Sequence, residues 1–290
     1  MGVFETIVSR EPVEKGWSGD RKFRAVCENG DAYLLRISPV ERREQRRALW
    51  DVLRDVQRLD ISMSRTLEVG ECPEGVYMLQ GWIDGPDAEL AIPELSAERQ
   101  YALGLDAGVM LKKLHTIPAP ADQEIWGVRF RRKALRKIDA YRICPMKFEG
   151  GEAMTAYIME NIGLIDGRPQ SFQHGDYHIG NMMLSGERLV IIDFDRFDYG
   201  DPWEEFNRIV WCAQASPRFA SGMVDGYFEG AVPEEFWRLL ALYISSNMLS
   251  SVSWTIPFGR RETDVMLRQA ADVLEWYGGM KNFVPKWYMY

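Results

Sequence analysis

The chain has little of what metal centres, disulfide frameworks and membrane anchors need. Its 290 residues include three histidines and four cysteines, and the cysteines form no C-x-x-C pair. Isolated cysteines indicate free thiols in a cytoplasmic enzyme rather than disulfides or a zinc knuckle. No apolar run is long enough to span a bilayer, and no signal-peptide pattern opens the chain. We therefore expect a cytoplasmic protein without a membrane partner.

Basic residues are fewer than acidic ones, 35 against 43. The formal net charge is −8, which argues against nucleic acid as a partner, while a hydrophobic content of 46% is ample for a packed core. Residues 193–235 hold ten acidic side chains against Arg196, Arg208 and Arg218. This segment is either a solvated helical face or a surface that attracts a cationic small molecule.

The order of patterns predicts an α+β chain in two parts. Residues 1–83 are rich in strand patterns, with FETIV, FRAVC and AYLLRIS as strands and ENGD as a turn between the last two. A helix is expected to open at Ser38, with Pro39 at its first position and Glu41 in a capping box. Residues 84–290 are mainly helical and contain one hairpin, NMML–SGE–RLVIIDFD. The division predicts a small β-rich lobe followed by a larger helical lobe.

A cluster of polar residues precedes that hairpin. QHGDYHIGNMML, residues 173–184, places Asp176 and Asn181 on a loop, and Asp193 ends the second strand of the hairpin. Because a hairpin brings its ends together, we expect Asn181 and Asp193 to be neighbours. Mg²⁺ prefers such oxygen ligands, and phosphoryl transfer needs them together with a carboxylate that accepts a hydroxyl proton.

Two other interpretations of this loop exist. His174 and Asp176 match the start of a 2-His-1-carboxylate iron site, but no histidine follows His178, and His115 lies in an apolar helix pattern. The loop is also compatible with a structural polar turn in which His174 only forms hydrogen bonds.

The motif H-G-D-Y-H-I-G-N followed by I-I-D-F-D resembles the signature of the aminoglycoside phosphotransferase family, which is related to choline kinases and has a protein-kinase-like fold. GWSGDRKFRAV resembles its phosphate loop, AYLLRIS its third strand, YMLQGWIDG its hinge between lobes, and YGDPWEEF the segment after the metal ligand. The resemblance implies a two-lobed fold with a nucleotide-binding lobe over 1–83 and a catalytic, acceptor-binding lobe over 84–290.

The resemblance also implies roles for residues of the loop. Asp176 would be the catalytic base, and Asn181 and Asp193 would hold Mg²⁺. His174 would support the loop, and His178 occupies a position from which it would approach the γ-phosphate of ATP or GTP. The phosphate loop would consist of Gly16, Ser18 and Gly19.

The nucleotide site departs from the family pattern. Arg36 stands where the family uses a lysine to pair the phosphates, and Lys22 is an alternative cation. Glu44 is the expected acidic partner on the helix after Ser38. The resemblance implies that the purine meets the backbone of the hinge residues, which are Gln80, Gly81, Trp82 and Ile83. ATP and GTP remain equal candidates.

The acceptor is expected to be a small, cationic molecule with a hydroxyl group. Acidic residues from the segment described above would bind it: Asp195, Asp198, Glu204, Glu205, Glu234 and Glu235. An antibiotic-modifying phosphotransferase is the leading interpretation. A metabolic kinase for an amino alcohol or a sugar and a catalytically weak nucleotide-binding protein are the alternatives. The sequence leaves open whether the protein is a monomer or a dimer.

Overall fold

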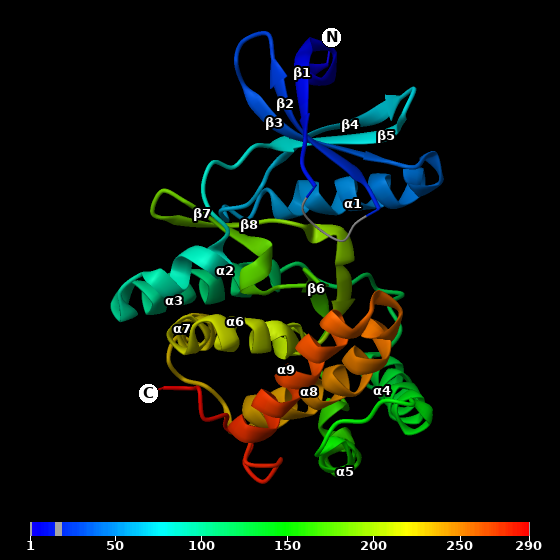
Figure 1. The fold of residues 1–290 in the computed structure, drawn as a ribbon, viewed down its shortest axis with the longest axis vertical. Helices are drawn as coiled ribbons and strands as arrows, with labels where there is room; N and C mark the ends of the chain where they lie inside the picture. Colours follow the sequence, from blue (N-terminus) through cyan, green and yellow to red (C-terminus); the bar gives the residue numbers. More distant parts are fainter. Residues whose placement is uncertain (1, 15–18, 290) are drawn as a thin grey trace. The chain divides into compact units, whose positions relative to one another are not determined.

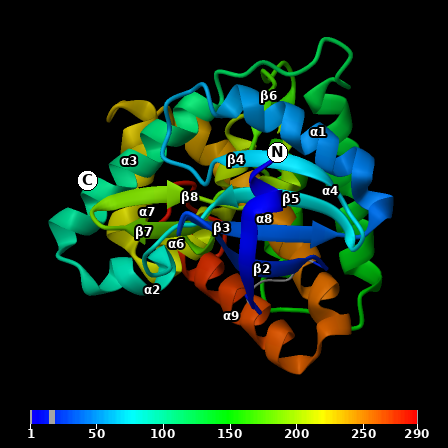
Figure 2. The same ribbon diagram turned by 90° about the horizontal axis from the view of Figure 1, so that it is seen from above.

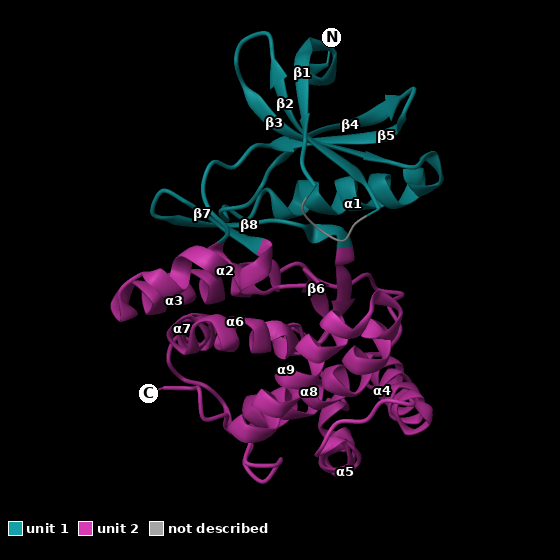
Figure 3. Cartoon of the chain, in the orientation of Figure 1, with its two compact units in different colours: residues 1–87, 182–195 teal, residues 88–181, 196–290 magenta. Residues whose placement is uncertain are grey.

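The computed structural model describes residues 2–14 and 19–289. They form two compact units, residues 1–87 with 182–195 and residues 88–181 with 196–290, which Figure 3 colours separately. The sequence predicted a single boundary near residue 83. The difference arises from the hairpin, because its backbone is bonded to the first unit: Ser64 N–H donates to Ile191 O at 2.9 Å, and Leu184 N–H donates to Pro86 O at 3.0 Å.

The first unit is an antiparallel sheet with one long helix. Its strand order is β1-β2-β3-β5-β4. The strands are β1 (Ile7–Pro12), β2 (Arg21–Cys27), β3 (Ala32–Ser38), β4 (Thr66–Cys72) and β5 (Gly75–Gly81). Helix α1 (Arg43–Val56) packs against β4 and β5, and Figure 1 shows it along one side of the sheet. The hairpin of β7 (Met182–Ser185) and β8 (Arg188–Ile191) completes the unit.

Two predicted element boundaries in this unit are wrong. FETIV was expected to be a strand, but Val3–Thr6 is a 3-10 helix and the strand continues to Pro12. The helix predicted to open at Ser38 begins at Arg43, after a 3-10 turn over Val40–Arg42. Ser38 remains in β3, where its side chain bonds to charged groups instead of capping a helix.

The second unit is mainly helical. Its helices are α2 (Ala88–Ala91), α3 (Ala97–Leu114), α4 (Trp126–Ile143), α5 (Gly151–Asn161), α6 (Ile209–Ala215), α7 (Pro217–Phe228), α8 (Glu234–Thr255) and α9 (Arg260–Trp276). A short antiparallel pair, β6 (Ser171–Gln173) and β9 (Asp198–Gly200), holds the two ends of the segment that contains the predicted catalytic loop and the hairpin.

Helices α3 and α7 lie side by side, as Figures 1 and 2 both show. Each presents two glycines four residues apart, Gly104 and Gly108 on α3 and Gly222 and Gly226 on α7. A Cβ at Gly104 or Gly108 would lie 2.2 Å from a backbone oxygen of α7. The glycines therefore permit backbone contact between the helices, which fixes α3 as a support for the loop described below.

Helix α8 corrects one expectation from the sequence. Residues Glu234–Phe258, which include the 3-10 turn after α8, are long and apolar enough to cross a membrane by length and composition alone. However, 67% of the apolar window is buried inside the protein. Burial of this kind is what a core helix requires, since core helices pass the same test of length and hydropathy.

Candidate active site

The predicted catalytic loop follows β6 directly. It begins at His174 and ends in the 3-10 turn Ile179–Asn181. Gly175 has a φ of +81°, and a Cβ at this position would lie 1.8 Å from the carbonyl oxygen of Arg196. Only glycine fits this close approach, so the residue between His174 and Asp176 fixes the path of the loop.

Three buried side chains hold the loop in place. The carboxylate of Glu205 accepts hydrogen bonds from Gly175 N–H at 3.0 Å and Tyr177 N–H at 3.4 Å. Tyr177 O–H donates to the carbonyl of Ala107 on α3 at 2.7 Å. His174 is fully buried, and its Nδ1 accepts from Asp176 N–H at 3.3 Å. His174 therefore supports the loop and does not reach a substrate.

Asp176 projects from this frame toward an imidazole and two guanidinium groups. Its Oδ1 lies 3.3 Å from Nε of Arg208 and 3.7 Å from Nε2 of His178, and its Oδ2 lies 3.7 Å from Nη1 of Arg196. Burial alone would raise the pKa of Asp176, but His178 and the two guanidinium groups outweigh it and hold the pKa well below its usual range. The carboxylate is therefore ionised at neutral pH.

His178 and Asn181 complete the loop on the same side. His178 Nδ1 accepts from Gly180 N–H at 3.1 Å, so the neutral ring carries its proton on Nε2, the atom nearest Asp176. Asn181 Nδ2 donates to the carbonyl of Asp176 at 2.9 Å. This bond assigns the amide orientation and leaves the carbonyl oxygen of Asn181 as its free acceptor atom.

The roles of Arg196 and Arg208 were not predicted from the sequence. A signal was present, because these are two of the three arginines within the acidic segment 193–235. Their positions relative to Asp176 could not be read from the sequence, since 20 and 32 residues separate them from it along the chain. The structure shows that both guanidinium groups face the candidate base.

The first unit holds the predicted metal ligand Asp193. Its φ of +64° lies in the left-handed region, which non-glycine residues adopt infrequently and often at functional sites. Its side chain is 38% exposed, and its Oδ1 lies 3.4 Å from Nη1 of Arg36. The carboxylate is therefore oriented by a cation while remaining open to solvent.

Arg36 belongs to a buried network of charges. Its Nη2 donates to Asp20 Oδ2 at 3.0 Å and also to Asp195. Arg46 on α1 donates from Nη2 to Asp20 Oδ2 at 2.5 Å and from Nη1 to Asp195 Oδ1 at 2.8 Å. Two arginines and two aspartates thus alternate around one centre, with Ser38 Oγ bonded to Asp20 at 2.8 Å.

This network corrects the predicted partner of Arg36. The side chain of Glu44 is 86% exposed and lies 3.7 Å from Arg47. Helix α1 begins five residues later than expected, and its buried face presents Arg46 instead. Asp20 therefore takes the role expected of Glu44. Lys22 lies opposite Arg36 in the register of β2 and β3; burial and the charge of Arg36 lower its pKa.

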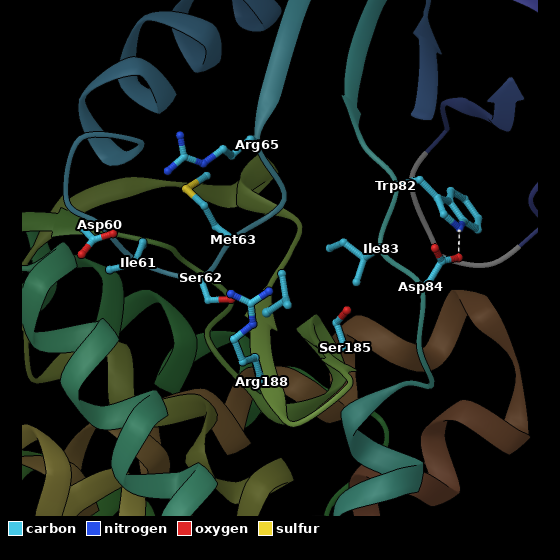
Figure 4. Close-up of a pocket in the computed structure, with 11 residues that line it drawn as sticks. Asp60, Ile61, Ser62, Met63, Arg65, Trp82, Ile83, Asp84, Ser185 and Arg188 are labelled. Carbon is cyan, nitrogen blue, oxygen red and sulfur yellow. Dashed lines mark hydrogen bonds between the residues drawn. The ribbon is translucent and has the colours of Figure 1, made fainter. Parts of the chain in front are cut away.

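The predicted hinge residues differ in what they are free to contact. Gln80 and Gly81 belong to β5, and the N–H groups of Gly81 and Trp82 donate to the carbonyls of Arg65 and Ala32. Trp82 and Ile83 line a cavity of about 580 Å³, and Figure 4 shows the Ile83 side chain directed into it. The cavity is lined by Asp60, Ile61, Ser62, Met63, Arg65, Trp82, Ile83, Asp84, Ser185, Arg188 and Val190. Gly16 and Ser18 lie outside the described residues, whereas Gly19 is described.

Most carboxylates of the acidic segment have partners within the protein, and one of them serves the catalytic loop. Glu205 is 2% exposed and serves the loop, so its assignment to the acceptor is wrong. Most of the other carboxylates have partners within the protein: Asp195 with Arg46, Asp198 with Arg129, Asp201 with Arg168, Glu204 with Lys133, Glu229 with Lys112, Glu234 with Arg238, and Asp225 with Tyr101 and Tyr288. Glu235 is exposed on the first turn of α8. Internal pairing thus engages many of the acids that a count over the segment had assigned to a ligand.

These two units, an antiparallel sheet with one helix and a larger helical body, define a protein-kinase-like fold, and comparison with known proteins agrees. A model of the phosphotransferase enzyme family matches residues 9–239, and the chain belongs to that family. A comparison with curated protein sequences gave no significant match.

Three solved structures illustrate the likeness of fold. A thermostable mutant of the aminoglycoside phosphotransferase APH(4)-Ia, in a ternary complex with ADP and hygromycin B, is 14% identical, with 94% of this chain and 95% of that one covered and a TM-score of 0.66. A choline/ethanolamine kinase family protein from Mesorhizobium loti is 18% identical, with 95% and 91% covered and a TM-score of 0.66. The amicoumacin kinase hAmiN, in complex with AMP-PNP and Ca²⁺, is 13% identical, with 97% and 90% covered and a TM-score of 0.64.

Proposed function

We propose that this protein transfers the γ-phosphate of ATP or GTP to a hydroxyl group of a small molecule, with Mg²⁺ as cofactor. The observation that carries the proposal is the ionised Asp176, fixed by Arg208 and Arg196 beside Asn181, in a member of a phosphotransferase family. Such a carboxylate can accept a hydrogen bond from an acceptor hydroxyl and orient it.

The reaction needs one proton acceptor on the protein. The hydroxyl oxygen forms a bond to the γ-phosphorus, and the bond from that phosphorus to the bridging oxygen breaks. The electron pair of the broken bond remains on the nucleoside diphosphate, and the hydroxyl proton passes to Asp176. Because the transition state of phosphoryl transfer is loose, the proton leaves late and a weak base is sufficient.

The residues proposed to hold Mg²⁺ fit a hard cation. Asn181 has its carbonyl oxygen available because its Nδ2 is committed to Asp176 O, and Asp193 has a solvent-accessible carboxylate. Mg²⁺ commonly uses one or two protein oxygens and completes its shell with water and substrate phosphate. When bound, the ion would neutralise charge on the phosphates.

The nucleotide has candidate contacts in the first unit. Arg36 already binds three carboxylates, so we assign it to positioning Asp193 and assign Lys22, its neighbour across β2 and β3, to the phosphates. At the hinge we assign the base to Ile83, because the N–H groups of Gly81 and Trp82 already bond within the protein. The four cysteines are free thiols, which supports the cytoplasm as the site of action.

Antibiotic modification is one version of this function, and a metabolic kinase is another. The bound hygromycin B and amicoumacin-type ligands of similar folds support testing antibiotics, and the choline/ethanolamine kinase family protein supports testing metabolites. Pairing within the acidic segment gives a polycationic acceptor no precedence over the other candidates.

Asp176→Asn tests the proposal. We expect consumption of Mg²⁺-nucleotide with an acceptor to fall by about 10²- to 10⁴-fold, while nucleotide affinity measured by calorimetry stays within about twofold. Asp122→Asn, an exposed aspartate outside the site, is the matched control and should leave turnover unchanged. Normal turnover in Asp176→Asn would refute the assigned base. Nucleotide binding without turnover in the unsubstituted protein would indicate a catalytically weak binding protein instead.

A further inference from the structure

The cavity of about 580 Å³ beside the hinge is formed by the first unit alone and has a fixed frame. Its walls come from residues 60–65, 82–84 and 185–190. Backbone hydrogen bonds join the first of these segments to the other two. Ser64 N–H donates to Ile191 O at 2.9 Å, just after the third segment. Gly81 N–H donates to Arg65 O at 2.8 Å, just before the second. The cavity is therefore formed before a ligand arrives, which lowers the cost of binding one.

The cavity lies on the other side of the hinge from the residues assigned to the nucleotide. The ring of Trp82 packs against the guanidinium group of Arg24 on β2, 5.5 Å from the ring centroid, and Arg24 shares one face of that strand with Lys22. Figure 4 shows the side chain of Ile83 directed the opposite way, into the cavity. Neither Lys22 nor Asp193 is among the described residues that line it. The cavity is therefore separate from the proposed phosphate and metal positions.

Four charged residues line the cavity, and two of them have no partner among the described residues. The carboxylate of Asp84 accepts a hydrogen bond from Trp82 Nε1 at 3.0 Å, and Asp60 also has a partner. Arg65 and Arg188 are exposed, and neither guanidinium group has an ion pair or a hydrogen bond within the described part of the chain. A guanidinium group offers a planar set of donors that matches phosphate and carboxylate.

The rest of the lining combines hydroxyl groups with an apolar wall. Ser62 and Ser185 supply the hydroxyl groups, and Figure 4 shows the Arg188 side chain directed toward the segment that holds Ser62. The buried apolar residues of the lining are Ile61, Met63 and Val190. Apolar walls with a few polar groups are typical of small-molecule sites, in which the polar groups fix the orientation of the ligand.

We propose that this cavity is a second ligand site, which binds a small molecule that has an apolar body and a phosphate or carboxylate group. Arg65 and Arg188 are the residues that bind the anionic group. The site goes beyond the proposed phosphotransfer and does not depend on it. Only Ile83 is shared, because its backbone is assigned to the nucleotide base and its side chain lines the cavity.

Modification of the two arginines tests the site directly. The full chain is treated with 2,3-butanedione at constant ionic strength, and adduct formation on Arg65 and Arg188 is followed by peptide mass spectrometry. We expect phenyl phosphate or benzoate to slow both modifications at least about fivefold, while acetate, benzyl alcohol and benzylamine have no effect. Acetate lacks the ring, and benzyl alcohol and benzylamine lack the negative charge. The two aromatic anions distinguish a phosphate from a carboxylate.

Arg54, an exposed arginine of α1 that does not line the cavity, reports nonspecific effects in the same samples. The proposal would be overturned if neither aromatic anion protected Arg65 and Arg188, or if Arg54 were protected equally. Equal protection by acetate, benzyl alcohol or benzylamine would overturn it as well.

A variant provides a second measurement. Arg188→Gln keeps a polar side chain at this exposed position and removes its charge, so the concentration of the protecting anion that halves the rate at Arg65 should rise at least about tenfold. Arg54→Gln and Lys22→Gln should leave that concentration unchanged. No change in Arg188→Gln would contradict the assignment, and an equal rise in Lys22→Gln would place the anion in the proposed nucleotide site instead. Since no nucleotide is present, this site and phosphotransfer can fail separately.

Discussion

Substitution of Asp20 by asparagine probes the buried charge network of the first unit. The side chain of Asp20 is fully buried, and its Oδ2 accepts from Arg36 at 3.0 Å and Arg46 at 2.5 Å. These two guanidinium groups have side-chain exposures of only 4% and 2%. Asparagine has nearly the same shape but removes the charge and directs an amide donor or a single oxygen toward several donors.

The expected loss follows from the burial of both arginines. Removing one partner of a buried ion pair costs about 3–5 kcal/mol, because the remaining charge is left uncompensated. Asp195 still contacts both arginines, so we expect the lower end, about 3 kcal/mol. For a chain of this size the loss corresponds to a decrease in Tm of about 6–12 °C.

Urea unfolding followed by tryptophan fluorescence and a thermal melt would measure the loss. Asp55→Asn is the matched control, since Asp55 pairs with Arg58 at 2.5 Å but the two side chains are 58% and 69% exposed. An exposed pair contributes at most about 0.5 kcal/mol, so the control should unfold almost normally. Equal losses in the two variants would refute the claim that burial of Asp20 makes the difference.

Two further perturbations test the carboxylates and the loop. Burial raises the pKa of Asp20, but the charge of Arg46, the Ser38 hydrogen bond and Arg36 lower it below its ordinary value, and the pKa of Asp176 is also lowered. In acid the unfolded chain therefore binds more protons than the folded protein. The stability that these carboxylates contribute is complete above pH about 5 and declines as the pH falls through 3.8 toward their folded-state pKa values. A series of Tm measurements against pH should therefore be flatter for Asp20→Asn than for the unsubstituted protein. Gly175→Ala should reduce turnover at least about 10²-fold, because the new Cβ would lie 1.8 Å from Arg196 O and displace the loop. The control is Gly186→Ala. Gly186 also has a positive φ, +59°, but open space surrounds it, so this variant should retain activity in the same assay. Equal activity of the two alanine variants would show that the loop path does not depend on Gly175.

Local sequence patterns predicted the parts of the fold that local interactions decide. The strand expected over AYLLRIS matches β3, Ala32–Ser38, because alternation and a turn signal define it within a few residues. The hairpin after Asn181 was found for the same reason. The prediction that Glu44 pairs with Arg36 was wrong because the start of α1 was placed too early. A shift of a few residues changes which side chain of a helix faces the sheet.

Pairing between residues far apart in the sequence explains why the partners of the charged residues could not be predicted. The acidic segment has a clear surplus of charge in the sequence, yet Asp201 pairs with Arg168 and Asp198 with Arg129, which lie 33 and 69 residues away. A charge count over a window cannot include partners outside it. Arg208 was counted inside the segment, but its partner Asp176 lies 32 residues earlier and outside the window, so the count could not show their contact.

The setting of Asp176 determines what kind of base it can be. A carboxylate held by Arg208, Arg196 and His178 has a pKa well below the ordinary range, so it cannot remove a proton from a hydroxyl before bonding to phosphorus is advanced. In a loose transition state the acceptor oxygen becomes acidic only late, and the earlier requirement is orientation of its lone pair. The arginines satisfy that requirement by fixing the carboxylate, and Glu205 fixes the backbone beneath it. In the proposed reaction we therefore expect this site to orient the acceptor hydroxyl rather than to deprotonate it early.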